Sequence, residues 1–272
     1  MNDKILRKNC RSKTFSMIRN SIHVLLFAFC FIMTGCEHEA KDEPEPEHVV
    51  EVSFTIRSLS GSSLKSAANS AENFIEKIIL FGVDDQNQVV QTFSISATGS
   101  TLTIPRKIKS LYAIANPSPA MEAASSVSDL TNMVGDFTNA PQSPFLMSGK
   151  SSVSGNSVNI ELIRVVAKIN IIGENGFQIT SVTVMNTTAK GYIFSRETLP
   201  APSPANMVDY TVNNNPSTIY IAENSRSNPI QFIVSGQLQG KPKSHFFTLE
   251  RGGQNIDILR NTSYQVSIRF ED

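Results

Sequence analysis

The sequence is poor in the residues that most often perform catalysis or bind metal ions. Its 272 residues include no tryptophan, three cysteines and four histidines. Few side chains are therefore available for proton transfer near neutral pH or for metal ligation. The sequence contains no Gly-x-Ser-x-Gly elbow, no Cys-x-x-Cys pair and no His-Glu-x-x-His helix. We therefore assign no catalytic residue, metal ligand or cofactor, and expect a protein that is not an enzyme.

The sequence also lacks an excess of charge of either sign, with 24 basic and 24 acidic residues. A basic field that would attract phosphates is absent, which argues against nucleic acid as a partner. Hydrophobic residues make up 40% and charged residues 18% of the chain, which indicates globular and not disordered material. The length suffices for two domains of ordinary size.

One long apolar run lies near the N-terminus, at residues 22–35, and six basic residues precede it. This is the pattern of a signal peptide, and the run is too short to span a bilayer comfortably. Met33-Thr34-Gly35-Cys36 resembles a bacterial lipobox, although Met33 stands where leucine is usual. We predict a lipoprotein signal peptide at residues 1–35 and lipidation of Cys36. A hydrophobic signal with a chance cysteine is the alternative, and Met17 competes with Met1 as the start.

Removal of residues 1–35 leaves 18 basic and 23 acidic residues, with Cys36 as the only cysteine. An intrachain disulfide is then impossible, and the acyl chains on Cys36 would hold the protein at a membrane. Residues 36–48 are acidic and contain two prolines, as expected of a solvated tether. Lys41-Asp42-Glu43 resembles a short signal for export to the outer face of the outer membrane; a charged linker is the alternative. We expect the cell outer membrane and the cell surface.

Alternation of apolar and polar residues dominates the remaining chain. In residues 49–57 the apolar positions are Val50, Val52, Phe54 and Ile56. Further strands are predicted at residues 74–83, 88–95, 101–104, 110–116, 180–186, 191–194, 218–222, 230–236, 244–249 and 262–270. Residues 158–172 are predicted as one long strand that passes from one core toward the next, and residues 84–87 as a hairpin turn.

One helix is predicted over residues 120–134, because Ser118-Pro119 supplies a cap and an N1 proline and Gly135 an end. Many short strands with a single helix predict an all-β fold of two tandem β-sandwich domains of transthyretin-like or Greek-key type. We place the first domain at residues 49–155 and the second at residues 156–272.

Several short motifs follow one another in a recognisable order. After Cys36, the first strand and a serine-rich loop with Lys65, they are IEKIILF (75–81), LYAIAN (111–116), FLMSG (145–149), RVVAKI (164–169), IYIAEN (219–224) and RNTSYQV (260–266). Together they resemble the fimbrillin family, the lipoprotein-derived type V pilin subunits of gut and oral anaerobic bacteria. The resemblance covers essentially the whole mature chain.

The resemblance implies export as a lipoprotein, cleavage by a trypsin-like protease after the first strand, and polymerisation by strand donation between fimbrial subunits. Lys65 is the best match to the cleavage position and Arg57 the second, although the family usually has arginine there. Burial of the four apolar side chains of the removed strand is worth about 6–12 kcal/mol at roughly 1.5–3 kcal/mol each. A neighbour's strand could recover that energy by refilling the groove. The alternative is that the strand is never removed.

Stalk pilins of the family continue into additional strands, often with a tryptophan, whereas this sequence stops at Asp272. We therefore expect a tip or minor subunit that contributes to adhesion, with a host or bacterial surface receptor as a possible partner. Two rivals stay open. One is a membrane-retained anchor or accessory lipoprotein, and the other is a glycan-binding or glycan-cleaving β-sandwich lipoprotein. The second rival predicts an exposed aromatic cluster or a close carboxylate pair.

Overall fold

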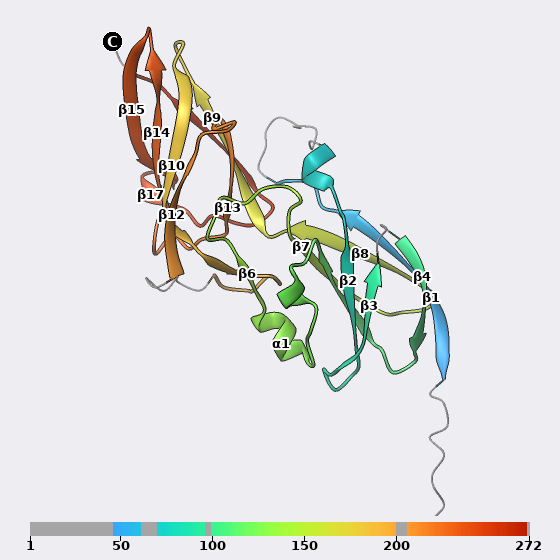
Figure 1. Ribbon diagram of the computed structural model, residues 1–272. Coiled ribbons are helices and arrows are strands. Elements are labelled where there is room, and N and C mark those ends of the chain that lie inside the picture. Colours follow the sequence, from blue (N-terminus) through green and yellow to red (C-terminus); the bar gives the residue numbers. More distant parts are fainter. Residues whose placement is uncertain (1–45, 61–69, 96–98, 200–205, 271–272) are drawn as a thin grey trace, which may run out of the picture. The chain divides into compact units, whose positions relative to one another are not determined.

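The computed structural model describes residues 46–60, 70–95, 99–199 and 206–270, which belong to one compact unit. These residues form several β-sheets, as the sequence predicts, together with a few short helical turns (Figure 1). The all-β prediction is confirmed.

The larger sheet has seven strands in the order β3-β2-β5-β7-β8-β1-β4. Their bounds are β1 (Glu47–Ile56), β2 (Ile78–Val83), β3 (Val89–Ile95), β4 (Gly99–Pro105), β5 (Ser110–Ala115), β7 (Met147–Ser152) and β8 (Ser157–Arg164). Neighbouring strands are antiparallel except β1 and β8, which are parallel. Buried residues from both ends of the sheet, such as Val52 and Leu80, belong to one hydrophobic cluster. The sheet therefore encloses its core as a sandwich does.

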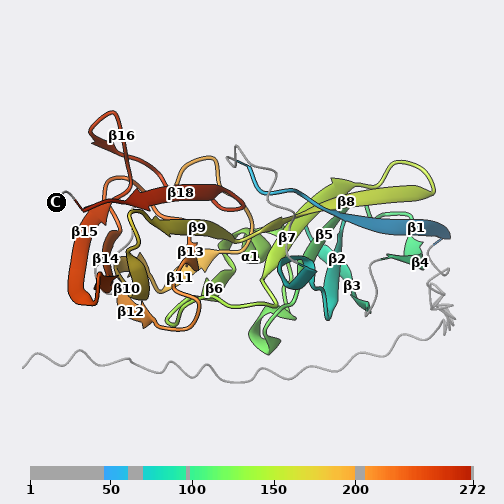
Figure 2. The same cartoon turned by 90° about the horizontal axis from the view of Figure 1, so that it is seen from above.

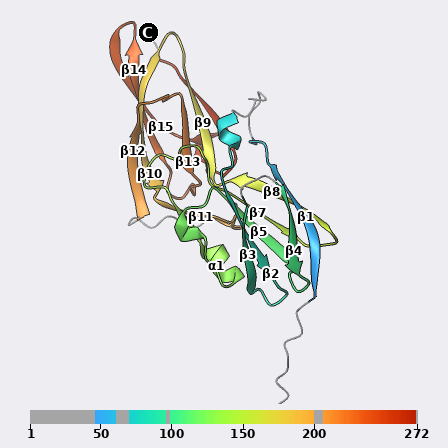
Figure 3. The ribbon, with the colours of Figure 1, turned by 45° about the vertical axis from the view of Figure 1, so that its right-hand side comes forward.

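β2 is buried on both faces. Ile78 and Leu80 pack into the main cluster, whereas Ile79 and Phe81 pack into a second cluster on the other face. The second cluster includes Leu130 of the helix α1 (Val127–Asn132), which lies near β2 and β3 in Figure 3. This double burial explains why β2 is a continuous apolar run.

The predicted helix at residues 120–134 is wrong in its extent. Ser118-Pro119 begins only a 3₁₀ turn, η2 (Pro119–Met121), and a 3₁₀ turn η1 (Ser70–Asn73) occurs earlier. The helix α1 starts later because Ser126 and Asp129 form a capping box, which satisfies main-chain donors at the helix start. After Met133 the chain is extended in β6 (Val134–Asp136), which pairs with β11 (Lys190–Tyr192).

The remaining strands form a second sandwich. Its four-stranded sheet has the order β12 (Met207–Val212), β10 (Gln178–Thr188), β14 (Gln231–Leu238) and β15 (Lys241–Thr248). Its three-stranded sheet consists of β13 (Thr218–Ala222), β9 (Val166–Gly173) and β18 (Ser263–Ile268). Ile169, Val182 and Phe232 belong to the cluster between these sheets. A small hairpin, β16 (Glu250–Arg251) and β17 (Gln254–Asn255), completes the set.

The single strand predicted over residues 158–172 is wrong, because the chain breaks it at Val165 into β8 and β9. The predicted passage between cores is confirmed: Val166 belongs to the first cluster and Ala167 to the second. The run is apolar on both faces because its two halves cover different cores. The division into two domains stays a prediction. A boundary drawn where the chain passes from the first hydrophobic cluster to the second lies between Val166 and Ala167, not between residues 155 and 156.

Candidate functional site

The first strand fills a gap inside the seven-stranded sheet. Figure 2 shows β1 between β8 and β4. β1 pairs with β4 antiparallel from Glu47 to Ser53, and with β8 in parallel from Glu51 to Ile56. In the described part of the chain β4 pairs with no other strand. Removal of β1 would therefore leave unpaired main-chain groups on both sides of a gap, and another extended segment could pair with both rows at once.

The two faces of β1 differ as its sequence predicts. Val50 and Val52 are 0% and 1% exposed, and Phe54 and Ile56 are partly buried against the same core. Glu51 on the outer face is exposed. The inward face of β1 is therefore part of the first core. The gap that it fills is lined on that side by apolar core residues.

Two buried polar side chains hold the main chain where it leaves β1; we call Arg164 and Asn261 the exit clamp. Arg164 Nη1 donates a 3.0 Å hydrogen bond to the carbonyl oxygen of Arg57. Asn261 Nδ2 donates to the carbonyl oxygens of Arg57 at 3.4 Å and Ser58 at 2.9 Å. Arg164 is 1% and Asn261 3% exposed. The hydrogen bonds from the exit clamp to residues 57 and 58 go to main-chain oxygens, so the clamp would accept many sequences in this position.

Arg164 is also bound from its other sides. Its Nε donates to the Glu72 carbonyl oxygen at 3.0 Å, Nη1 to Asn261 Oδ1 at 2.8 Å, and Nη2 to Asn73 Oδ1. Desolvation by burial lowers the pKa of Arg164, while the nearby Glu72 and Tyr220 oppose that shift. A buried guanidinium requires nearly all of these acceptors, because each one that is lost leaves a desolvated donor unpaired.

The carboxylate of Glu72 continues this buried network. Its Oε1 accepts hydrogen bonds from Lys168 Nζ at 2.7 Å and from the Tyr220 hydroxyl at 2.8 Å. Burial and the neighbouring carboxylate both raise the pKa of Tyr220. Arg164 and Lys168 belong to the RVVAKI motif on which the family resemblance partly rests. That motif therefore places two cations in one network at the junction of the two cores.

The chain past β1 also contacts the second sandwich. Ser60 N donates to the Asn261 carbonyl oxygen at 3.0 Å, and Ser263 N donates to the Ser60 carbonyl oxygen at 2.7 Å. Ser60 thereby forms a parallel bridge with Thr262, directly before β18. The chain from Glu47 to Ser60 therefore pairs with β4 and β8 of the first sandwich and then forms a bridge to Thr262 of the second.

Of the predicted processing and lipidation residues, the structure describes only Arg57. Arg57 carries a half-exposed side chain that forms an ion pair with Glu161 and lowers the pKa of that carboxyl group. Cys36 and Lys65 lie outside the described residues. No motif or spacing in the sequence indicates Glu72, Asn73 or Asn261 as partners of Arg164.

Other features of the described part carry no site. Asp84 Oδ1 accepts from the main-chain nitrogens of Gln86 at 2.9 Å and Gln88 at 2.8 Å, so it shapes the predicted hairpin turn. Among the described residues, no three His, Cys, Asp or Glu side chains gather as a metal site. In the same residues, no helix has the length and apolar character that a membrane span requires.

No family model and no curated protein matches the sequence. Solved structures with a similar fold include a candidate cell adhesion protein from Bacteroides eggerthii (TM-score 0.59, 14% identity, 82% of this chain and 86% of that one). A fimbrial assembly protein from Parabacteroides distasonis has a TM-score of 0.58 and 18% identity, with 82% and 91% of the two chains covered. The C-terminally truncated tip fimbrial protein Mfa3 from Porphyromonas gingivalis has a TM-score of 0.58 and 14% identity, with 84% and 96% covered. The chain thus shares its fold with fimbrial and candidate adhesion proteins of these bacteria.

Proposed function

We propose that this chain is a surface-exposed fimbrial subunit that contributes to adhesion. It is exported as a lipoprotein with lipid on Cys36, loses its first strand to a protease, and accepts a strand of another subunit in its place. The observation that carries the proposal is the position of β1, an interior strand with a buried face that lies at the start of the described chain. The shared fold with solved fimbrial proteins supports it.

The energetics favour replacement of β1 over an empty gap. Its four inward side chains contribute about 6–12 kcal/mol as an upper estimate. Loss of residues 47–60 would also deprive Arg164 and Asn261 of the carbonyl oxygens that they bind. A strand from a neighbouring subunit supplies such carbonyl oxygens whatever its side chains are, which is the chemistry of strand addition.

The exit clamp also distinguishes the two candidate processing positions. A protease that cuts after Arg57 must bind the carbonyl group of that residue, which in this structure accepts hydrogen bonds from two buried side chains. The Arg57 amide in turn donates to the Leu162 carbonyl oxygen at 2.9 Å. The Arg57–Ser58 bond is thus protected in the folded precursor, and we propose Lys65 as the cleavage position.

The place of the last strand supports an accepting subunit. β18 pairs in parallel with β9 from Ser263 to Ile268, and Ile268 is 1% exposed within the second core. Unlike β1, β18 is not released by the proposed cleavage after Lys65, so it stays paired with β9 of its own subunit. We therefore propose a tip or minor position in the fibre.

Limited trypsin treatment of the Cys36→Ser chain, read by intact mass, tests the processing step. We expect cleavage after Lys65 in the unchanged chain and in the matched Arg57→Ala variant, but not in Lys65→Ala. A synthetic peptide of residues 46–60 with a fluorescent label should then exchange into the cut protein and not into the uncut one. Cutting after Arg57 in the folded Lys65→Ala chain, or equal uptake of peptide by cut and uncut protein, would contradict the proposal.

A further inference from the structure

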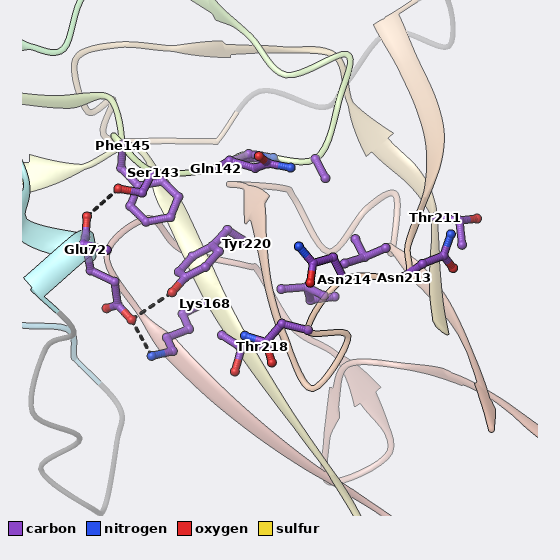
Figure 4. A pocket seen from close by; sticks show the side chains of 16 residues that line it. Glu72, Gln142, Ser143, Phe145, Lys168, Thr211, Asn213, Asn214, Thr218 and Tyr220 are labelled. Atoms are coloured by element: carbon purple, nitrogen blue, oxygen red, sulfur yellow. Dashed lines mark hydrogen bonds and ion pairs between the residues drawn. The ribbon is translucent and has the colours of Figure 1, made fainter. Parts of the chain in front are cut away.

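A cleft of about 640 Å³ includes Glu72, Lys168 and Tyr220 of the buried network in its lining, and none of its lining comes from β1. Its walls come from four separate parts of the chain (Figure 4). These are η1, the segment 140–145, Lys168 of β9, and residues 211–220 from the end of β12 into β13. The volume is in the range of small-molecule binding sites in proteins.

An aromatic ring held in a fixed position lies in the middle of the cleft. The ring of Tyr220 packs against that of Phe145, with centroids 4.3 Å apart and planes tilted by 47°. Its hydroxyl group donates to Glu72 Oε1, so the ring is held by this hydrogen bond and by its packing against Phe145. Tyr220 is only partly buried, and Figure 4 shows it exposed to the interior of the cleft. It offers a ligand an apolar surface without further ordering of the side chain.

The charges that line the cleft compensate each other. Lys168 Nζ and Glu72 Oε1 are 2.7 Å apart, and both side chains are less than a tenth exposed. No other residue of the lining carries a charge. An anion or a cation in the cleft would find no uncompensated opposite charge, which disfavours a charged ligand.

The rim is rich in amide side chains that are free to bind. In the view of Figure 4, Gln142 lies above Tyr220, and Asn213 and Asn214 lie to its right. All three are exposed, and among the described residues none of their side chains has a hydrogen-bond partner. Each amide can donate two hydrogen bonds and accept two. Thr211 and Thr218 add hydroxyl groups to the same lining.

We propose that this cleft binds a neutral carbohydrate. Amide groups match the paired donors and acceptors of adjacent sugar hydroxyls, the Tyr220 ring packs against the apolar face of a sugar ring, and compensated charges suit an uncharged ligand. The proposal does not depend on strand exchange, because no lining residue belongs to the removable segment. A neutral carbohydrate bound in this cleft would be the ligand through which the subunit contributes to adhesion.

Saturation-transfer NMR on the Cys36→Ser chain tests the inference with maltohexaose, cellohexaose and mannohexaose as neutral probes. Hexagalacturonate and an uncharged hexapeptide serve as comparisons. We expect transfer to at least one neutral probe, about tenfold weaker binding in the Gln142→Ala and Asn213→Ala variants, and a larger loss in Tyr220→Ala. Tyr220→Phe keeps the ring and should retain most of the binding. Gln91→Ala, which removes an exposed amide from β3, is the matched control and should bind normally.

Circular dichroism of each variant separates loss of the site from loss of the fold. Absence of transfer to all three neutral probes would overturn the inference. So would binding that the exposed substitutions Gln142→Ala and Asn213→Ala leave unchanged, or preferential binding of hexagalacturonate or the peptide.

Discussion

Truncation of the two fully buried side chains of β1 should weaken the fold in proportion to what the strand contributes. Val50 and Val52 are 0% and 1% exposed in the first core. Each Val→Ala change removes two methyl groups, worth about 0.8 kcal/mol each in transfer free energy, and leaves a small cavity. We expect about 2 kcal/mol of lost unfolding free energy for each change and about 3–5 kcal/mol for both, since side chains on one face can couple.

Urea unfolding of the Cys36→Ser chain, with and without the double substitution, measures this loss from the transition midpoint at constant slope. Glu51→Gln, on the exposed face of the same strand, is the matched control and should change stability by less than about 0.5 kcal/mol. A loss below about 1 kcal/mol in the double variant, or one equal to that of the control, would refute the view that β1 completes the core.

Three further outcomes follow from the structure. Arg164→Met leaves the acceptors of the buried guanidinium unpaired, so urea unfolding should show a loss of about 3–5 kcal/mol, and trypsin should now cut after Arg57; an unchanged digest would contradict the exit clamp. Hydrogen bonds from the preceding serines lower the pKa of Asp129, so its stabilisation is present above the unfolded pKa of about 3.9 and is lost as pH falls through the lower folded value. Asp129→Asn should reduce the change in the thermal midpoint between pH 5 and pH 2. An unchanged pH dependence would exclude this cap as the cause of the acid destabilisation. Gly149→Ala places a Cβ 2.3 Å from the main chain of β8 and should destabilise by about 1–3 kcal/mol or more, whereas Gly99→Ala meets only ordinary contacts at 3.5 Å; equal effects in thermal unfolding would show that β7 can shift.

Local patterns predicted the strands well where one face is buried. The alternation from Val50 to Ile56 and the turn at residues 84–87 both depend on neighbours in sequence, and both occur in the structure. The helix was misplaced because two serine-based starting signals compete, and the one with a reciprocal acidic partner, Ser126 with Asp129, determines the helix. β12 was not predicted at all, and its residues are only partly buried or exposed.

The polar network could not be predicted from sequence. Glu72 and Lys168 are 96 positions apart, and Glu72 and Tyr220 148 positions apart. Only the tertiary fold shows that they share one carboxylate oxygen. The same holds for the cleft, whose amides occur in two turns that look like ordinary solvated loops in the sequence. Long-range pairing of polar side chains leaves no periodic trace in a single sequence.

The N-terminal residue of the subunit in sheared fimbriae tests the central claim most directly. Mass spectrometry of that material should find a chain that begins at Ser66, without lipid and without Val50 to Ile56. A chain that begins at lipidated Cys36 and occurs only in the membrane fraction would contradict the account and would identify a retained anchor in place of an assembled subunit.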